Sequence, residues 1–228
     1  YSCLVIHDCE IFQDYGITTD EEFQRFSGFY WLKYVLSFTA FNELKLLVDV
    51  KFNSISGFTL PNPIDFPFYG VIFDLPLALL ETVMQVDQSK NYFLLRHYFN
   101  FIIFFISSIY FFLILKNRFN NNLISNLGLM FYVGSPRIFG DSFFNNKDLI
   151  FLSLVTVALF YSFKFLKNFN YKNIIVFAVF SAIATSSRII GIFLPISVIA
   201  ILFFDILDKK IEKKYIFKVI VLVILYFI

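Results

Sequence analysis

The residues best suited to chemistry lie near the start of the chain, in the polar segment Gly16–Gly28. Three consecutive carboxylates, Asp20, Glu21 and Glu22, occur there. A carboxylate can take the proton from a hydroxyl group as that hydroxyl attacks an electrophile, so one of the three is a candidate general base. Acidic clusters are more often solvated loops, and the chemical interpretation therefore depends on the rest of the chain.

The rest of the chain is more apolar than a soluble domain. Apolar residues make up 58% of its 228 residues, whereas soluble domains have roughly 45–50%. This composition predicts an all-α polytopic membrane protein. No stripe of basic residues indicates nucleic-acid binding, and no phosphate-loop, zinc-protease or serine-hydrolase motif is present. We expect one domain over residues 1–228, truncated at both ends.

Polar and apolar segments alternate in an order that predicts a long external segment, residues 7–96, followed by membrane spans in 97–228. Within the external segment, apolar and aromatic residues at helical spacing predict interfacial helices over 26–41 and 69–86. The proline-rich stretch 57–67 between them is predicted to be a turn region. Residues 1–6 are predicted to end an earlier span, and the runs long enough to cross, or nearly cross, a bilayer are 97–115, 123–135, 149–166, 174–186 and 189–207.

The positions of the cations predict which ends of the spans face the cytoplasm. Basic residues concentrate in the turns 116–118, 164–172 and 209–218, which the positive-inside tendency assigns to the cytoplasm. Counting spans then places the external segment, the loop 137–148 and the junction Ser187-Arg188 on the opposite face. We therefore expect these three polar elements to meet on one non-cytoplasmic face.

Several charged residues on this face are candidates for substrate binding. Asp148 precedes an apolar span, where a carboxylate is costly and often functional, although it is equally suited to capping the helix that starts there. Arg96, Arg137 and Arg188 are suited to phosphate, because a guanidinium group can bind it through two parallel hydrogen bonds. The alternative for Arg96 and Arg188 is that they extend to lipid head groups.

The order of these elements resembles that of the GT-C membrane glycosyltransferases. The likeness is to the glycosyltransferase family 39 type, which comprises the protein O-mannosyltransferases, the aminoarabinose transferase ArnT and the RgtA/B/C/D-like group. The matching segments cover most of the chain and are Gln13–Arg25, Leu95–His97, Ser135–Asp148 and Thr185–Gly191. The resemblance implies a GT-C-type transmembrane helix bundle whose long first extracytoplasmic loop carries interfacial helices.

The resemblance also implies roles for single residues. Asp20 falls at the family's catalytic aspartate, with Glu21 completing an Asp-Glu pair, although Glu21 or Glu22 stays open as the working base. Asp148 falls at a second acidic position, which in some members helps to hold a divalent metal ion near the lipid phosphate. Arg96 matches an arginine at the start of the second span that the mannosyltransferases need.

The activity implied is the inverting transfer of a hexosyl or pentosyl group from a polyprenyl-phosphate sugar to a hydroxyl acceptor on a lipid, a glycan or a protein. Arg96, Arg188, and Arg137 or Lys147 would then stabilise the charge that grows on the leaving phosphate. The composition fits an AT-rich bacterial genome, so we expect a multi-pass protein of a bacterial inner membrane. The alternatives are a transporter or flippase for a lipid-linked or anionic substrate, and a structural membrane subunit.

Overall fold

The computed structural model describes residues 16–55, 60–66 and 70–208, together with Phe217, Val223, Ile224 and Tyr226. Of the residues that the structure describes, 84% are helical. It divides into two compact units. The first contains the described residues up to Ile102 and the segment Gly140–Asn146, and the second contains Ile103–Phe139 and the described residues from Lys147 onward. The fold confirms the prediction of a polytopic, all-helical membrane protein.

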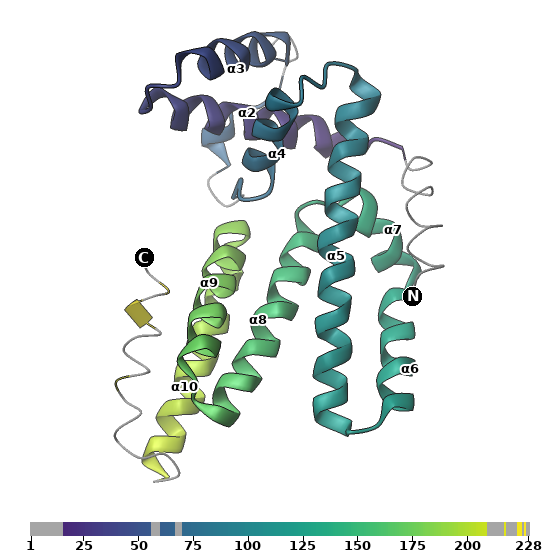
Figure 1. The fold of residues 1–228 in the computed structure, drawn as a ribbon, viewed down its shortest axis with the longest axis vertical. Helices are drawn as coiled ribbons and strands as arrows, with labels where there is room; N and C mark the ends of the chain where they lie inside the picture. The colour runs from purple at the N-terminus through teal and green to yellow at the C-terminus, as the bar shows by residue number, and fades with distance from the viewer. Residues whose placement is uncertain are drawn as a thin grey trace. The chain divides into compact units, whose positions relative to one another are not determined.

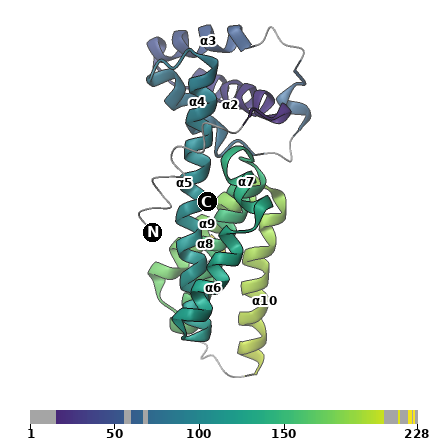
Figure 2. The same cartoon turned by 90° about the vertical axis from the view of Figure 1, so that its right-hand side faces the viewer.

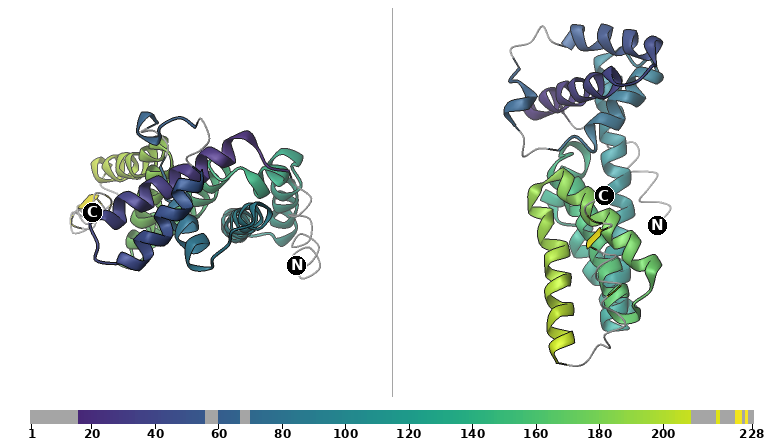
Figure 3. Two further views of the ribbon diagram at one scale, coloured as in Figure 1. Left: turned by 90° about the horizontal axis from the view of Figure 1, so that it is seen from above. Right: turned by 90° about the vertical axis from the view of Figure 1, so that its left-hand side faces the viewer.

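The first unit is built from three helices around the start of a fourth. These helices are α2 (Thr19–Ser37), α3 (Asn42–Ile55), α4 (Asp74–Val83) and α5 (Ser89–Phe119), with a short 3-10 helix η1 at Pro63–Asp65. Figure 2 shows α3 and α4 next to α2. In the view from above in Figure 3, α5 is seen nearly end-on, whereas α2 lies across the view.

Helix α2 begins where the sequence carries an N-terminal capping signal. Glu21 is the third helical residue, and its Oε1 atom accepts hydrogen bonds from the backbone nitrogen and the hydroxyl of Thr18, at 2.9 and 3.0 Å. Further along, Phe29, Leu32 and Leu36 recur at helical spacing and form one core cluster with residues of α3 and α4. The acidic cluster is therefore the first turn of a helix.

The predictions for the first unit were right about two helices and incomplete about the others. The helix predicted over 26–41 is α2, which starts seven residues earlier, and the helix predicted over 69–86 is the shorter α4. Helix α3 was not predicted, because its charged residues are mixed with apolar ones and its apolar face is weak. The predictions for residues 1–6 and, apart from Phe217, for the basic turn 209–218 lie outside the described residues.

The second unit is a bundle of antiparallel helices. Its elements, besides the second half of α5, are α6 (Asn122–Val133), the start of α7 (Pro136–Phe144), α8 (Asp148–Asn168), α9 (Tyr171–Ser187), the 3-10 helix η2 (Ile189–Ile192) and α10 (Phe193–Leu207). Helices α8 and α9 pack along their length, as Figure 1 shows. Phe165, Phe177 and Leu202 are fully buried at the centre of the core that α8, α9 and α10 share.

Among the described residues, three stretches are long and apolar enough to cross a membrane: Ser89–Phe119, Asp148–Asn168 and Ile189–Leu207. The predicted spans 123–135 and 174–186 correspond to the shorter apolar helices α6 and α9. The span predicted over 97–115 lies within α5, which extends beyond it in both directions. The loop predicted over 137–148 is mostly the helix α7, which starts at Pro136, because proline is well suited to the first position of a helix.

Within the second unit, the connections lie at two opposite ends. The turns between α5 and α6 and between α8 and α9 lie at the same end in Figures 1 and 2, and both carry basic residues nearby. The start of α8 and the end of α9 lie at the other end. This arrangement agrees with the predicted separation of the basic turns from the junction at Arg188.

Candidate functional site

The three carboxylates of the first turn of α2 have different surroundings. Asp20 and Glu22 are exposed, whereas Glu21 is 2% exposed. The second oxygen of Glu21, Oε2, lies 2.9 Å from Nε2 of His97 on α5. An ionised carboxylate can only accept hydrogen bonds, so the ring nitrogen is the donor. Glu21 is thus engaged through both oxygens, and its neighbours Asp20 and Glu22 are the carboxylates that remain accessible.

A second buried cluster joins α4, α5 and the segment after α7. Nη1 of Arg96 and the side-chain nitrogen of Asn146 donate to the same oxygen of Asp74, at 2.9 and 2.8 Å. All three side chains are buried. Sequence reasoning missed Asp74 and Asn146. The available signal was the carboxylate of Asp74 at the start of an apolar helix, because a buried acid requires a partner.

Four buried polar atoms of the first unit make no hydrogen bond within the described part of the chain. They are Nη2 of Arg96 and the amide oxygens of Gln24, Asn100 and Asn146. Buried polar groups are nearly always hydrogen-bonded to protein or to ordered water. The cluster around Arg96 therefore has unused capacity to bind water or a polar ligand.

Helices α2 and α4 approach each other closely at Gly28. A Cβ atom on Gly28 would lie 2.6 Å from the backbone carbonyl oxygen of Asp74, which is closer than two such atoms can come. The absence of a side chain at Gly28 thus permits the contact that holds the start of α4, and with it the partner of Arg96, against α2. A helical glycine costs about 0.5–1 kcal/mol relative to alanine, and here the close packing requires it.

We expect Gly28→Ala to destabilise the first unit by about 1–3 kcal/mol, because the added methyl group forces the two backbones apart. Gly140→Ala in α7 is the matched control, since its added Cβ meets nothing within 4 Å apart from its chain neighbours and the backbone of its own helix. The control is expected to be neutral or slightly stabilising. Thermal unfolding of the full chain in detergent measures both. Equal effects of the two substitutions would contradict the steric argument.

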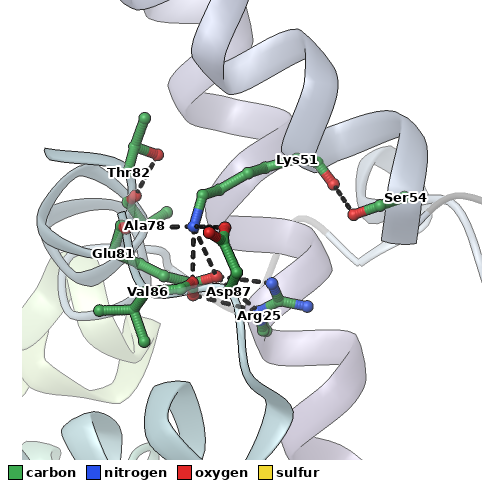
Figure 4. Close-up of polar contacts among 8 residues, drawn as sticks. All are labelled: Arg25, Lys51, Ser54, Ala78, Glu81, Thr82, Val86 and Asp87. Carbon is green, nitrogen blue, oxygen red and sulfur yellow. Dashed lines mark hydrogen bonds and ion pairs between the residues drawn. The ribbon is translucent and has the colours of Figure 1, made fainter. Parts of the chain in front are cut away.

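A third buried cluster joins α2, α3 and α4 (Figure 4). Nε and Nη2 of Arg25 donate to the two oxygens of Glu81 at 3.1 and 2.5 Å, and the guanidinium carbon lies 3.6 Å from the centre of the Tyr92 ring. Nζ of Lys51 donates to the backbone carbonyls of Glu81 and Val86 at 3.2 and 2.6 Å. We call Arg25, Lys51 and Glu81 the helix lock, because one carboxylate connects three helices.

Two of the charged residues predicted in the second unit, Asp148 and Arg188, pair directly. Asp148 is the first residue of α8, and Arg188 follows the end of α9 in extended backbone. Nη2 of Arg188 forms an ion pair with Oδ1 of Asp148. Arg137 is the second residue of α7, and Lys147 directly precedes α8. The fold therefore brings together an acidic and a basic residue, Asp148 and Arg188, that are 40 positions apart in the sequence.

The model of one protein family matches the chain over residues 78–228, and this family is described as dolichyl-phosphate-mannose-protein mannosyltransferase. The chain belongs to this family. No curated protein and no solved structure matches it. The match runs from α4 through the end of the chain, so it includes Arg96, Asp148 and Arg188 and begins after Asp20 and Glu21.

Membership in the mannosyltransferase family confirms the resemblance to the GT-C glycosyltransferases. The chain is therefore a membrane glycosyltransferase of the class that uses polyprenyl-phosphate sugars. The roles predicted for single residues remain predictions.

The metal role predicted for Asp148 remains a prediction. Within the described ranges, no group of three or more His, Cys, Asp or Glu side chains could hold a metal ion. The carboxylate of Asp148 forms an ion pair with the guanidinium group of Arg188. The function proposed below uses no step at a metal ion.

Proposed function

We propose that this mannosyltransferase-family chain transfers a sugar, with inversion, from a polyprenyl phosphate to a hydroxyl acceptor at the non-cytoplasmic face, and that Asp20 is the general base. Asp20 would take the proton of the acceptor hydroxyl while its oxygen bonds to the anomeric carbon of the sugar. The bond from this carbon to the phosphate oxygen breaks, and the polyprenyl phosphate leaves with the electron pair. One displacement at the anomeric carbon inverts its configuration.

The observation that carries the assignment is the contrast between neighbouring carboxylates. Glu21 is buried and engaged with Thr18 and His97, whereas Asp20 is exposed at the start of the same helix. A base must reach the proton that it removes, and Asp20 is accessible to an acceptor. We infer that Glu21 is a positioning residue, which fixes the first turn of α2 against α5.

The leaving phosphate requires positive partners, and the structure supports Arg96 as one of them. Nη1 of Arg96 is held by Asp74, which orients the guanidinium group, while Nη2 makes no hydrogen bond within the described residues. A guanidinium group with a fixed orientation and a remaining donor can stabilise charge on a phosphate oxygen with little reorganisation. We propose Arg188, Arg137 and Lys147 as further phosphate-binding residues.

The experiment that tests the function uses the full chain in liposomes with a panel of labelled polyprenyl-phosphate sugars and hydroxyl acceptors. We expect one donor to be consumed with release of polyprenyl phosphate, and the product to have the inverted anomeric configuration by NMR. Retained configuration would exclude the single displacement. Movement of the donor between leaflets without cleavage would instead support a transporter.

Glu21→Gln separates positioning from base catalysis. The glutamine keeps an oxygen that can accept from Thr18 but loses the charge-assisted hydrogen bond to His97, which is worth about 1.5–3 kcal/mol. We therefore expect transfer to fall roughly ten- to a hundredfold, with measurable activity remaining. Single-turnover rates with the labelled donor measure this. Complete loss in Glu21→Gln, with Asp20→Asn active, would assign the base to Glu21.

A further inference from the structure

The second unit contains a basic pocket at the end of the bundle that carries the basic turns. The pocket lies between the last turns of α5 and α8 and has a volume of about 630 Å³. In Figure 1, α8 diverges from the lower part of α5 toward this end. The pocket is lined by Ile114, Asn117, Arg118, Phe160, Phe163, Lys164, Lys167 and Asn168. Its size is within the range of small-molecule sites, which is about 300–1,000 Å³.

The lining contains three cations and no acid. Arg118, Lys164 and Lys167 form no ion pair with any residue that the structure describes. Asn117 and Asn168 add amide groups that can donate hydrogen bonds. Three like charges around one concavity repel one another, so an anion bound among them would be stabilised by all three.

Cations at the end of a membrane span have a general explanation, but this explanation does not account for their clustering around the pocket. Cations near helix C-termini interact favourably with the helix dipoles, and they mark the cytoplasmic ends of spans. Both effects account for Lys116 in the last turn of α5, and the second accounts for Lys172 near the start of α9; neither residue lines the pocket. Neither effect explains why three cations surround a single concavity.

The other wall of the pocket is apolar and well fixed. The ring of Phe160 packs edge-on against Tyr110 of α5, at 5.2 Å between ring centres, and this contact joins the two helices just above the cations. Nζ of Lys164 lies 4.7 Å from the centre of the Phe160 ring. The site thus combines a polar rim with an apolar floor formed by membrane-crossing helices.

We propose that this pocket binds the phosphate group of an anionic membrane phospholipid, with the acyl chains along the apolar surfaces of α5 and α8. Basic pockets between transmembrane helices on the cytoplasmic side are suited to anionic head groups. The charge distribution of the sequence predicts that this end is cytoplasmic. The lipid would occupy the groove between α5 and α8 at the end of the bundle opposite the Asp148–Arg188 pair, so the proposal does not depend on the proposed catalytic function.

The test is native mass spectrometry of the full chain in neutral detergent, titrated with phosphatidylglycerol or phosphatidylcholine. The variant is Lys164→Gln/Lys167→Gln. The control is Lys116→Gln/Lys172→Gln, which removes the same charge from the same end of the bundle without touching the pocket. Lys164→Arg/Lys167→Arg keeps the charge and checks that the pocket tolerates substitution. Helicity by circular dichroism is compared for all four proteins, and inorganic phosphate is added as a competitor.

We expect wild type to retain one phosphatidylglycerol in preference to phosphatidylcholine. The pocket variant should bind it at least roughly tenfold more weakly, since each cation near the surface contributes to anionic lipid binding. The control and the arginine variant should stay within twofold of wild type. Equal weakening in the pocket variant and the control, or no preference for the anionic lipid, would overturn the proposal. Displacement of the lipid by an equal concentration of inorganic phosphate would show that the ligand is a free phosphate instead.

Discussion

Replacing Asp20 with asparagine should lower the rate of sugar transfer by roughly 10²–10⁴-fold, the usual contribution of a general base. The amide has nearly the shape of the carboxylate but cannot take the proton from the acceptor hydroxyl. Asp20 is exposed, so the substitution leaves no buried group unpaired and the chain should insert and fold as before. The loss should appear in kcat, because the proton is transferred in the transition state.

Glu22→Gln is the matched control for Asp20→Asn. Glu22 is the exposed carboxylate two residues further along α2, and its replacement removes the same charge from the same helical turn. If the charge of the turn matters only for attracting substrate, both variants lose activity equally. If Asp20 is the base, only its variant fails in single-turnover measurements with saturating donor. Wild-type turnover in Asp20→Asn would remove Asp20 from the mechanism.

The largest effect on stability is expected from breaking the helix lock. Glu81→Gln leaves the guanidinium group of Arg25 buried against a neutral amide, and removing one member of a buried ion pair costs about 3–5 kcal/mol. The same carboxylate also lies 3.9 Å from Lys51, so α2, α3 and α4 all lose a common partner. We therefore expect the first unit to unfold at a markedly lower temperature.

Two further variants show whether the burial of this pair causes the effect. Asp49→Asn breaks the exposed ion pair between Lys33 of α2 and Asp49 of α3, which should cost less than about 1 kcal/mol. In Arg25→Met/Glu81→Leu, both charges are replaced by apolar side chains, and much of the loss should be recovered. A cost in Asp49→Asn equal to that in Glu81→Gln would contradict the argument.

The sequence offers a local probe for these measurements. Its single tryptophan, Trp31, lies in α2 between Tyr30 and Tyr34, with ring centres 5.6 and 5.7 Å away. Intrinsic tryptophan fluorescence therefore reports on the first unit, whereas circular dichroism reports on all the helices of the chain together. A variant that destabilises only the first unit should shift the fluorescence transition more than the loss of helicity.

The membrane helices could be predicted from the sequence, because a long apolar run has few other stable arrangements. The predicted runs 149–166 and 189–207 correspond to α8 and to η2 with α10. The first unit was harder. The start of α2 was placed at residue 26, where the apolar periodicity begins, although Thr18 and Glu21 carried a capping signal seven residues earlier.

Candidate residues for the site could be chosen from the sequence, and their roles stay predictions, but their pairings could not be predicted. Spacing and charge identified Arg96, Asp148 and Arg188, and counting spans predicted that the last two would share a face. The partner of Arg96 is 22 residues away, and Asn146 reaches Asp74 across 72 residues. Contacts of this range depend on how the helices pack, and no local pattern in a single sequence specifies them. The engagement of Glu21 by His97 has the same origin.

Helix α8 has charged residues near both ends, and their separation has a consequence for the membrane around it. Lys167 follows Asp148 by 19 positions, which corresponds to about 28 Å along a helix. The hydrocarbon core of a typical bilayer is about 30 Å thick. In a markedly thicker bilayer, the hydrophobic mismatch would draw either the Asp148–Arg188 pair or the basic pocket toward the acyl chains. The length of the lipid acyl chains should therefore change the surroundings of both the Asp148–Arg188 pair and the basic pocket.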